Sequence, residues 1–226
     1  GNVSEEIILD GRVLSAQTKY LIVHDKLIDA AIKLLNKKSV DVNTLSVSDV
    51  CKQAKVAVSS GYNHFPNGFV DVYHGIFKLT LQNVEDSLSD MTIQSKSSEY
   101  KVNYYLQAVA NSVVALGEAS RLTLFHYREM ASLEGFVFGE PKLLLDALIK
   151  DYCQEQGIPK YKALVEDTWI SFNGLLYIWM RFDKNSELFS KYDDEWFLKS
   201  IKNLFKRKAS NAFIKIFARC GDFVSN

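Results

Sequence analysis

The stretch from Ser46 to Asp71, SVSDVCKQAKVAVSSGYNHFPNGFVD, decides the fold of this chain. Ser46 and Asp49 have the S-x-x-D spacing of a capping box, which predicts that a helix begins there. The apolar residues of this helix recur every three or four positions and form one face; they are Val47, Val50, Cys51 and Ala54. After a break at residues 55–57, a second short helix is predicted from Val58 to about Phe65, and Pro66-Asn67-Gly68 ends it.

Two short helices joined by a tight turn are typical of a helix-turn-helix. The second helix carries small or hydrogen-bonding side chains, which suit phosphates and base edges in the major groove of DNA. With the cap and the turn included, the residues predicted to contact DNA are Ser46, Lys55, Ser59, Ser60, Tyr62, Asn63 and His64.

This stretch resembles the DNA-binding segment of the TetR family of bacterial transcriptional regulators. The family pattern is an apolar helix, a capped second helix, a recognition helix that ends Y-x-x-F-P, and a long connecting helix. Here the first helix is predicted from Leu21 to Asn36, residues 62–66 read YNHFP, and the connecting helix is predicted over residues 68–90. The spacing from Val58 is closer to the LuxR/HapR-type quorum-sensing regulators within this family.

The sequence departs from the family pattern at the turn and at two phosphate-contacting positions. The usual turn glycine is replaced by Lys55, so we expect a turn conformation that tolerates a side chain. Lysines that are usual early in the recognition helix and just after the proline are replaced by Val58 and Gly68. These changes concern the phosphate contacts rather than the presence of the module.

The composition favours long helices. The chain has 226 residues, of which 47% are hydrophobic and 24% charged, with only three prolines and eleven glycines. We therefore predict an all-α fold. The helix-turn-helix pattern predicts a three-helix DNA-binding head, and the TetR resemblance implies a C-terminal helical domain for effector binding and dimerisation. The predicted segments are an extended or frayed arm over residues 1–18, the head over residues 19–67, and the C-terminal domain over residues 68–226.

The net charge of zero counts against nucleic-acid binding, but the charges are unevenly distributed. Residues 19–78 hold eight lysines against five aspartates, a balance of +3, and a dimer would present twice that charge at its two heads. The chain has no long apolar run and no signal-peptide pattern, and its three cysteines are widely spaced. We therefore expect a cytoplasmic protein with reduced thiols and no membrane partner.

The helix predicted over residues 161–182 is apolar nearly all round, so we expect it to be covered by its own core on one side and by a second subunit on the other. A last long helix is predicted over residues 194–219. The TetR resemblance implies that the last two long helices of each subunit form a four-helix bundle in a homodimer. The predicted dimerisation residues are Trp179, Phe197, Ile201, Leu204 and Phe205.

The C-terminal domain is rich in aromatic residues, and the resemblance implies that some of them line a cavity for a small hydrophobic or aromatic effector. The candidate lining residues are Tyr105, Phe125, His126, Trp169 and Phe172, with His126 as the group that orients the ligand. The alternative is that these side chains fill the core, as aromatic residues generally do.

No pattern indicates catalysis, a cofactor or a metal site. His126 and Glu129 share a helix face, but a carboxylate-bridged metal centre needs a second matching pair. Cys153 lacks a neighbouring histidine and is expected to be a buried structural cysteine. The basic residues from Lys199 to Lys215 fit either a membrane-surface or partner helix or, as we favour, a dimerisation helix with a solvated outer face.

Together with these patterns, the TetR resemblance implies a homodimeric, ligand-responsive transcriptional regulator, a repressor that binds a palindromic operator in double-stranded DNA. The alternative is a helical small-molecule-binding protein or an enzyme that contains the motif without a regulatory role.

Overall fold

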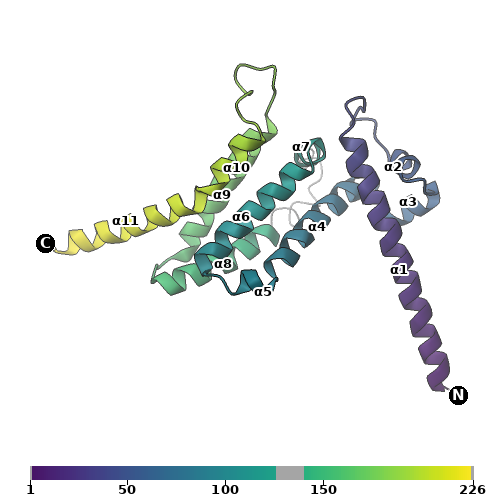
Figure 1. The fold of residues 1–226 in the computed structure, drawn as a ribbon, viewed down its shortest axis with the longest axis horizontal. Coiled ribbons are helices and arrows are strands. Elements are labelled where there is room, and N and C mark those ends of the chain that lie inside the picture. The colour runs from purple at the N-terminus through teal and green to yellow at the C-terminus, as the bar shows by residue number, and fades with distance from the viewer. Residues whose placement is uncertain (1, 126–139, 225–226) are drawn as a thin grey trace. The chain divides into compact units, whose positions relative to one another are not determined.

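The computed structural model describes residues 2–125 and 140–224. In these residues the fold is all α-helical, as the sequence predicts, and no β-strand is present (Figure 1). None of the helices described here is both long and apolar enough to span a membrane.

The first helices are α1 (Asn2–Leu35), α2 (Val47–Ala54), α3 (Val58–His64), α4 (Phe69–Leu88) and α5 (Met91–Gln94). They are followed by α6 (Ser98–Ala115), α7 (Glu118–Phe125), α8 (Glu140–Gln156), α9 (Tyr161–Met180), α10 (Asp194–Lys202) and α11 (Leu204–Val224).

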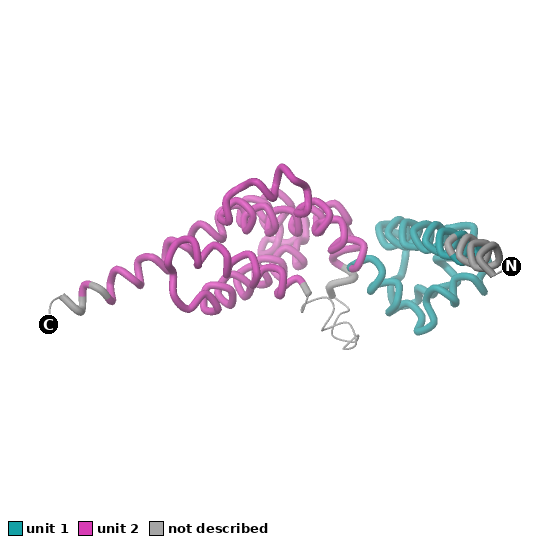
Figure 2. The backbone as a smooth tube through the Cα atoms, turned by 90° about the horizontal axis from the view of Figure 1, so that it is seen from below, with its two compact units in different colours: residues 1–77 teal, residues 78–226 magenta. Residues whose placement is uncertain are grey.

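The chain divides into two compact units, residues 1–77 and residues 78–226 (Figure 2). The boundary lies inside α4, whereas the sequence predicted it between residues 67 and 68. The first half of α4 belongs to unit 1, and it approaches α1 at Gly75. A Cβ atom added at Gly75 of α4 would lie only 2.4 Å from Cδ1 of Ile28 of α1. Unit 1 therefore extends past the end of the predicted helix-turn-helix into α4.

Helix α1 is longer than predicted. Residues 2–20 are helical and continue into the predicted helix that starts at Leu21, so the prediction of an extended or frayed arm is wrong. The segment contains no proline, and its one glycine, Gly11, weakens the helix by about 1 kcal/mol without ending it. The C-terminal half of α1 carries the core of unit 1, where the buried residues are Leu27, Ile28, Ala30, Ala31, Leu34 and Leu35.

Unit 2 is built around α6, α8, α9 and α10. Helix α6 packs against α8 and α10, and α9 packs against α8, α10 and α11. In the aromatic core the ring of Trp179 stacks on Phe197 at a centroid distance of 5.4 Å, and Phe172 meets Phe197 edge-on at 6.4 Å. The single helix predicted over residues 194–219 is two helices, because α10 ends at Lys202 with Asn203 as its C-cap and α11 begins at Leu204.

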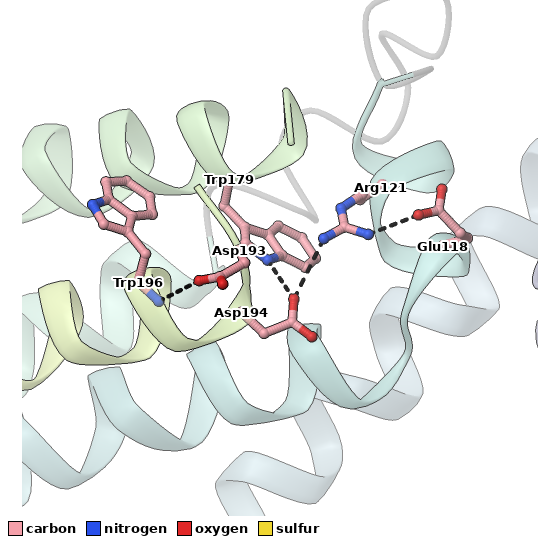
Figure 3. A network of polar contacts seen from close by, with 6 residues as sticks. All are labelled: Glu118, Arg121, Trp179, Asp193, Asp194 and Trp196. Atoms are coloured by element: carbon pink, nitrogen blue, oxygen red, sulfur yellow. Dashed lines mark hydrogen bonds and ion pairs between the residues drawn. The ribbon is translucent and has the colours of Figure 1, made fainter. Parts of the chain in front are cut away.

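Arg121 of α7 joins three helices of unit 2 (Figure 3). Its Nη1 atom pairs with Glu118 at 2.7 Å, and its Nη2 atom lies 3.4 Å from Asp194 Oδ1 at the start of α10. The guanidinium lies 4.4 Å from the ring centroid of Trp179, whose Nε1–H donates to Asp194 at 2.9 Å. Charge-assisted hydrogen bonds and the cation–π contact thus hold α7, α9 and α10 together.

The residues predicted at the dimer interface lie in the core of a single chain. Their exposed fractions are 0% for Trp179, Phe197 and Phe205, 1% for Ile201 and 2% for Leu204. A side chain that its own chain covers completely has no surface left for a second copy, so this choice of contact residues is wrong. The uncovered side of α9 instead carries Ile170, Gly174 and Tyr177.

Candidate nucleic-acid interface

Helix α2 begins with the predicted capping box. The Ser46 hydroxyl accepts a hydrogen bond from the Asp49 amide at 3.3 Å, and the Asp49 carboxylate accepts one from the Ser46 amide at 2.9 Å. These bonds satisfy backbone donors that the start of a helix leaves unpaired. The predicted apolar face is confirmed, because all four of its residues are buried: Val47, Val50, Cys51 and Ala54.

The turn after α2 is held by Lys55. Its backbone is left-handed, with φ 57° and ψ 45°, and its amide donates to the carbonyls of Cys51 and Lys52. Glycine is the residue that adopts this conformation without steric cost, whereas a side chain there costs about 1 kcal/mol. The turn therefore keeps the geometry that suits a glycine and places the Lys55 side chain in solvent.

Gly61 lets α3 lie directly on α2. A Cβ atom at this position would come within 2.1 Å of Cys51 Sγ and 3.1 Å of Val47 Cγ1. A residue with a Cβ fits this crossing only if the Cys51 side chain turns away or α2 and α3 move apart. The absence of a side chain at Gly61 therefore permits the short distance between the two helices.

The side of α3 opposite Gly61 is open to solvent. Val58, Ser59, Tyr62 and Asn63 are exposed and recur at the spacing of one helix face, while Ser60 is half-buried at its edge. This face offers a hydroxyl, a phenol and an amide side by side. Three of the predicted DNA contacts, Ser59, Tyr62 and Asn63, therefore share one accessible surface.

His64 points back toward α1 instead of lying on this open face. Its ring stacks on Tyr20 at a centroid distance of 4.0 Å, and its Nδ1 atom lies 3.3 Å from Nδ1 of His24. The ring centroids of the two histidines are 5.4 Å apart, so the two nitrogens lie close to the line between the rings and point at one another. This arrangement is a hydrogen bond that requires one protonated and one unprotonated Nδ1.

The surroundings of His64 favour its neutral form. Burial lowers the pKa of its imidazole below the ordinary value, and the neighbouring His24 lowers it further. His64 therefore ties the end of α3 to α1 as a stacked, neutral ring.

Ser46 and Lys55 differ in what they can offer a ligand. The Ser46 hydroxyl is half-buried and donates to the Asp49 carboxylate at 2.9 Å, so the cap already uses it. Lys55 is exposed, as is Lys52 one turn earlier, and both ammonium groups are available to phosphates.

The predicted effector residues that the structure describes pack inside unit 2. Tyr105 is buried, and its hydroxyl donates to the carbonyl of Pro141 at 3.0 Å; burial raises the pKa of this phenol. Phe172 is buried and Trp169 is half-buried. His126 lies outside the described residues, and so does the Phe125 side chain. Tyr105 and Phe172 therefore behave as core residues, the alternative that the sequence left open.

Among the described side chains, no group of three or more histidines, cysteines, aspartates or glutamates is placed to hold a metal ion. In comparisons with known proteins, no family model, no curated protein and no solved structure matches this chain. The evidence for the candidate interface therefore comes from the geometry of α1, α2 and α3.

Three residues that shape the interface, Gly61, Tyr20 and His24, were missed in the sequence. Gly61 stands in the middle of a short helix, where a glycine signals close packing of another element. Tyr20 and His24 are four residues apart and so share a face of α1. That spacing indicates that Tyr20 and His24 can contact a common partner. It does not identify the partner, because His64 is distant in sequence.

Proposed function

We propose that this protein is a DNA-binding transcriptional regulator of the TetR type, and that α3 enters the major groove. The observation that carries the proposal is the open face of α3, with Ser59, Tyr62 and Asn63, above a helix crossing that Gly61 keeps short. Amide and hydroxyl side chains on an exposed helix face suit base edges and phosphates. Lys52 and Lys55, both exposed, add charge for the DNA backbone.

The test is fluorescence anisotropy with labelled duplexes from the region upstream of the gene, supplemented by selection from random duplexes. We expect salt-dependent binding of the intact chain to one palindromic sequence. Asn63→Ala should weaken this binding by about 1–3 kcal/mol, roughly five- to 150-fold, with little change in melting temperature because Asn63 is exposed.

The matched control is Asn83→Ala, which removes an exposed amide from α4 outside unit 1 and should leave DNA binding unchanged. Two results would contradict the proposal: no duplex bound at low salt, or a folded Asn63→Ala variant that binds as tightly as the original chain.

Assembly as a homodimer is part of the same proposal, with different contact residues from those first predicted. Ile170 and Tyr177 are 65% and 60% exposed on α9, and Gly174 lies between them with no atom within 4 Å of a Cβ built there. Beside this ridge runs an open groove of about 530 Å³ between α9 and the α10–α11 pair. Apolar residues so placed favour a second copy of the chain as cover.

Sedimentation equilibrium tests the dimer. Ile170→Glu or Tyr177→Glu should raise the dissociation constant at least about tenfold, because each places a charge in an apolar contact. Leu188→Glu is the control, since Leu188 is 74% exposed in the α9–α10 connection and lies outside this surface. A wild-type chain that is monomeric at micromolar concentration would contradict this part of the proposal.

Control by a small hydrophobic or aromatic effector completes the proposal. An effector changes operator affinity only by its preference for one of two conformations, so it must alter both melting temperature and DNA binding. A thermal-shift screen of apolar and aromatic compounds on the full chain, followed by anisotropy with each hit, measures both. If the compounds that stabilise the protein leave its DNA affinity unchanged, the regulatory part of the proposal is wrong.

A further inference from the structure

The most basic part of the chain lies in unit 2, far from the predicted head in the sequence. No acidic residue occurs between Glu195 and Asp222, and the stretch holds seven cations: Lys199, Lys202, Lys206, Arg207, Lys208, Lys215 and Arg219. Because the net charge of the chain is zero, these residues contribute +7 and the remainder of the chain −7. The charge is therefore segregated onto α10 and α11.

Part of this charge borders a groove with an apolar floor. The groove lies between residues 158–160, the first two turns of α9 and the middle of α11, and its volume is about 270 Å³. Its apolar lining consists of Ile158, Pro159, Ala163, Leu164, Ala212 and Ile216. Its cations are Lys160, Lys208, Lys215 and Arg219.

Little negative charge balances these cations. Asp167 is the acidic residue in the lining, and it pairs with Lys208 at 2.9 Å. Lys160, Lys215 and Arg219 form no ion pair with any residue that the structure describes. Lys208, Lys215 and Arg219 are seven and four residues apart, a spacing that aligns them along one side of α11. A row of cations thus follows an apolar floor.

We propose that this groove docks an acidic amphipathic helix of a partner protein. The apolar residues of such a helix, spaced three and four positions apart, fit the floor, and its carboxylates meet Lys160, Lys215 and Arg219. Charge complementarity of this kind directs association and excludes partners of the wrong sign. The inference concerns a surface separate from the open face of α3 and does not depend on DNA binding.

Two other occupants fit the groove less well. A second copy centred on the groove by a two-fold axis would place Lys215 and Arg219 near their own equivalents, which repel. Nucleic acid would match the cations, but its phosphates and sugars would leave the apolar floor without an apolar partner. An acidic amphipathic helix satisfies both features at once.

The probe is a fluorescein-labelled amphipathic peptide of glutamate and leucine, titrated with the full chain and followed by anisotropy. We expect saturable binding that weakens with salt, and no binding of a lysine–leucine peptide with the same pattern. The double variant Lys215→Glu/Arg219→Glu should weaken binding at least about tenfold. The control Lys202→Glu/Lys206→Glu changes charge equally outside the groove lining and should weaken binding less than about twofold.

Three other outcomes would overturn the proposal. Equal loss with both double variants would mean that general attraction to the basic helices, not the groove, binds the peptide. Tighter binding of a duplex of matched length, lost in Lys215→Glu/Arg219→Glu, would assign the groove to nucleic acid. Dissociation of a dimer by that variant would assign it to a second copy. If the variant does not fold, Lys215→Gln/Arg219→Gln replaces it, with Lys202→Gln/Lys206→Gln as the control of equal charge.

Discussion

Gly61 in α3 and Gly174 in α9 are both mid-helix glycines, and their surroundings are opposite. A Cβ atom at Gly61 would lie 2.1 Å from Cys51 Sγ, whereas a Cβ atom at Gly174 would meet nothing within 4 Å. Glycine weakens a helix in both places by about 1 kcal/mol relative to alanine. In unit 1 the missing side chain permits a close crossing of two helices. In unit 2 no contact within the chain offsets the loss of helix propensity. The same residue type therefore marks a packed site in one unit and an open surface in the other.

The largest effect is expected from Gly61→Ala. The new methyl group collides with buried Cys51 and Val47, so the free energy of unfolding should fall by about 1–3 kcal/mol even after the gain in helix propensity. Urea denaturation followed by circular dichroism measures the change. In the Cys51→Ala background the sulfur is gone, and the same substitution should cost clearly less. Equal costs in both backgrounds would show that the crossing is not limited by this contact.

Gly174→Ala should act in the opposite direction. The methyl group has space, so helix propensity alone should raise the free energy of unfolding by about 0.8 kcal/mol. Denaturation at protein concentrations below the dissociation constant of the dimer gives this value for the single chain. A loss of stability there would mean that the open space at Gly174 closes in solution, and the contrast with Gly61 would disappear.

Lys55→Gly tests the turn that precedes α3. Relief of the left-handed backbone outweighs the larger entropy of glycine in the unfolded chain, so we expect a gain of about 0.5 kcal/mol. Lys52→Gly is the matched control one turn earlier, where the backbone is helical and glycine should cost about 1 kcal/mol. A loss of similar size at both positions would show that the left-handed turn carries no strain.

The smallest expected effect is a pH dependence of the stability of unit 1, which His64 causes. The pKa of His64 in the folded chain is lowered from 6.5, first by burial and then by His24, so the unfolded chain binds more protons at slightly acidic pH. Stability is therefore full above pH 6.5 and falls as the pH drops through 6.5 toward the lower folded-state pKa. Denaturation curves at several pH values should show this fall in the original chain and a reduced fall in His64→Gln. An identical pH dependence in both would remove His64 as its source.

The local structure around α2 and α3 was predictable because short-range rules determine it. The S-x-x-D cap, the apolar face of α2 and the stop at residues 66–68 each depend on neighbouring residues, and the helices begin and end within one or two residues of the prediction. The all-helical class followed from composition in the same way. The continuous helix from Asn2 was missed because a weak pattern was taken for the absence of a helix.

The side on which an apolar helix is covered was not predictable in the same way. Helix α9 is apolar nearly all round, so its pattern does not distinguish Trp179, which is fully buried, from Tyr177, which is 60% exposed. The position of His64 was missed for a related reason. Its partners Tyr20 and His24 are about forty residues away in sequence, and periodicity within α3 carries no information about them.

The sequence by itself determined the helical class, the caps and turns, and the short α2–α3 pair, because these depend on interactions within a few residues. Tertiary structure alone decided that α2 and α3 pack closely at Gly61, that His64 is stacked against α1, and that the predicted dimer residues form a core. It also brought Lys160 and Arg219, nearly sixty residues apart, to the same groove. Such outcomes depend on which apolar surfaces cover one another, and burial is non-directional, so a local pattern does not specify its partner.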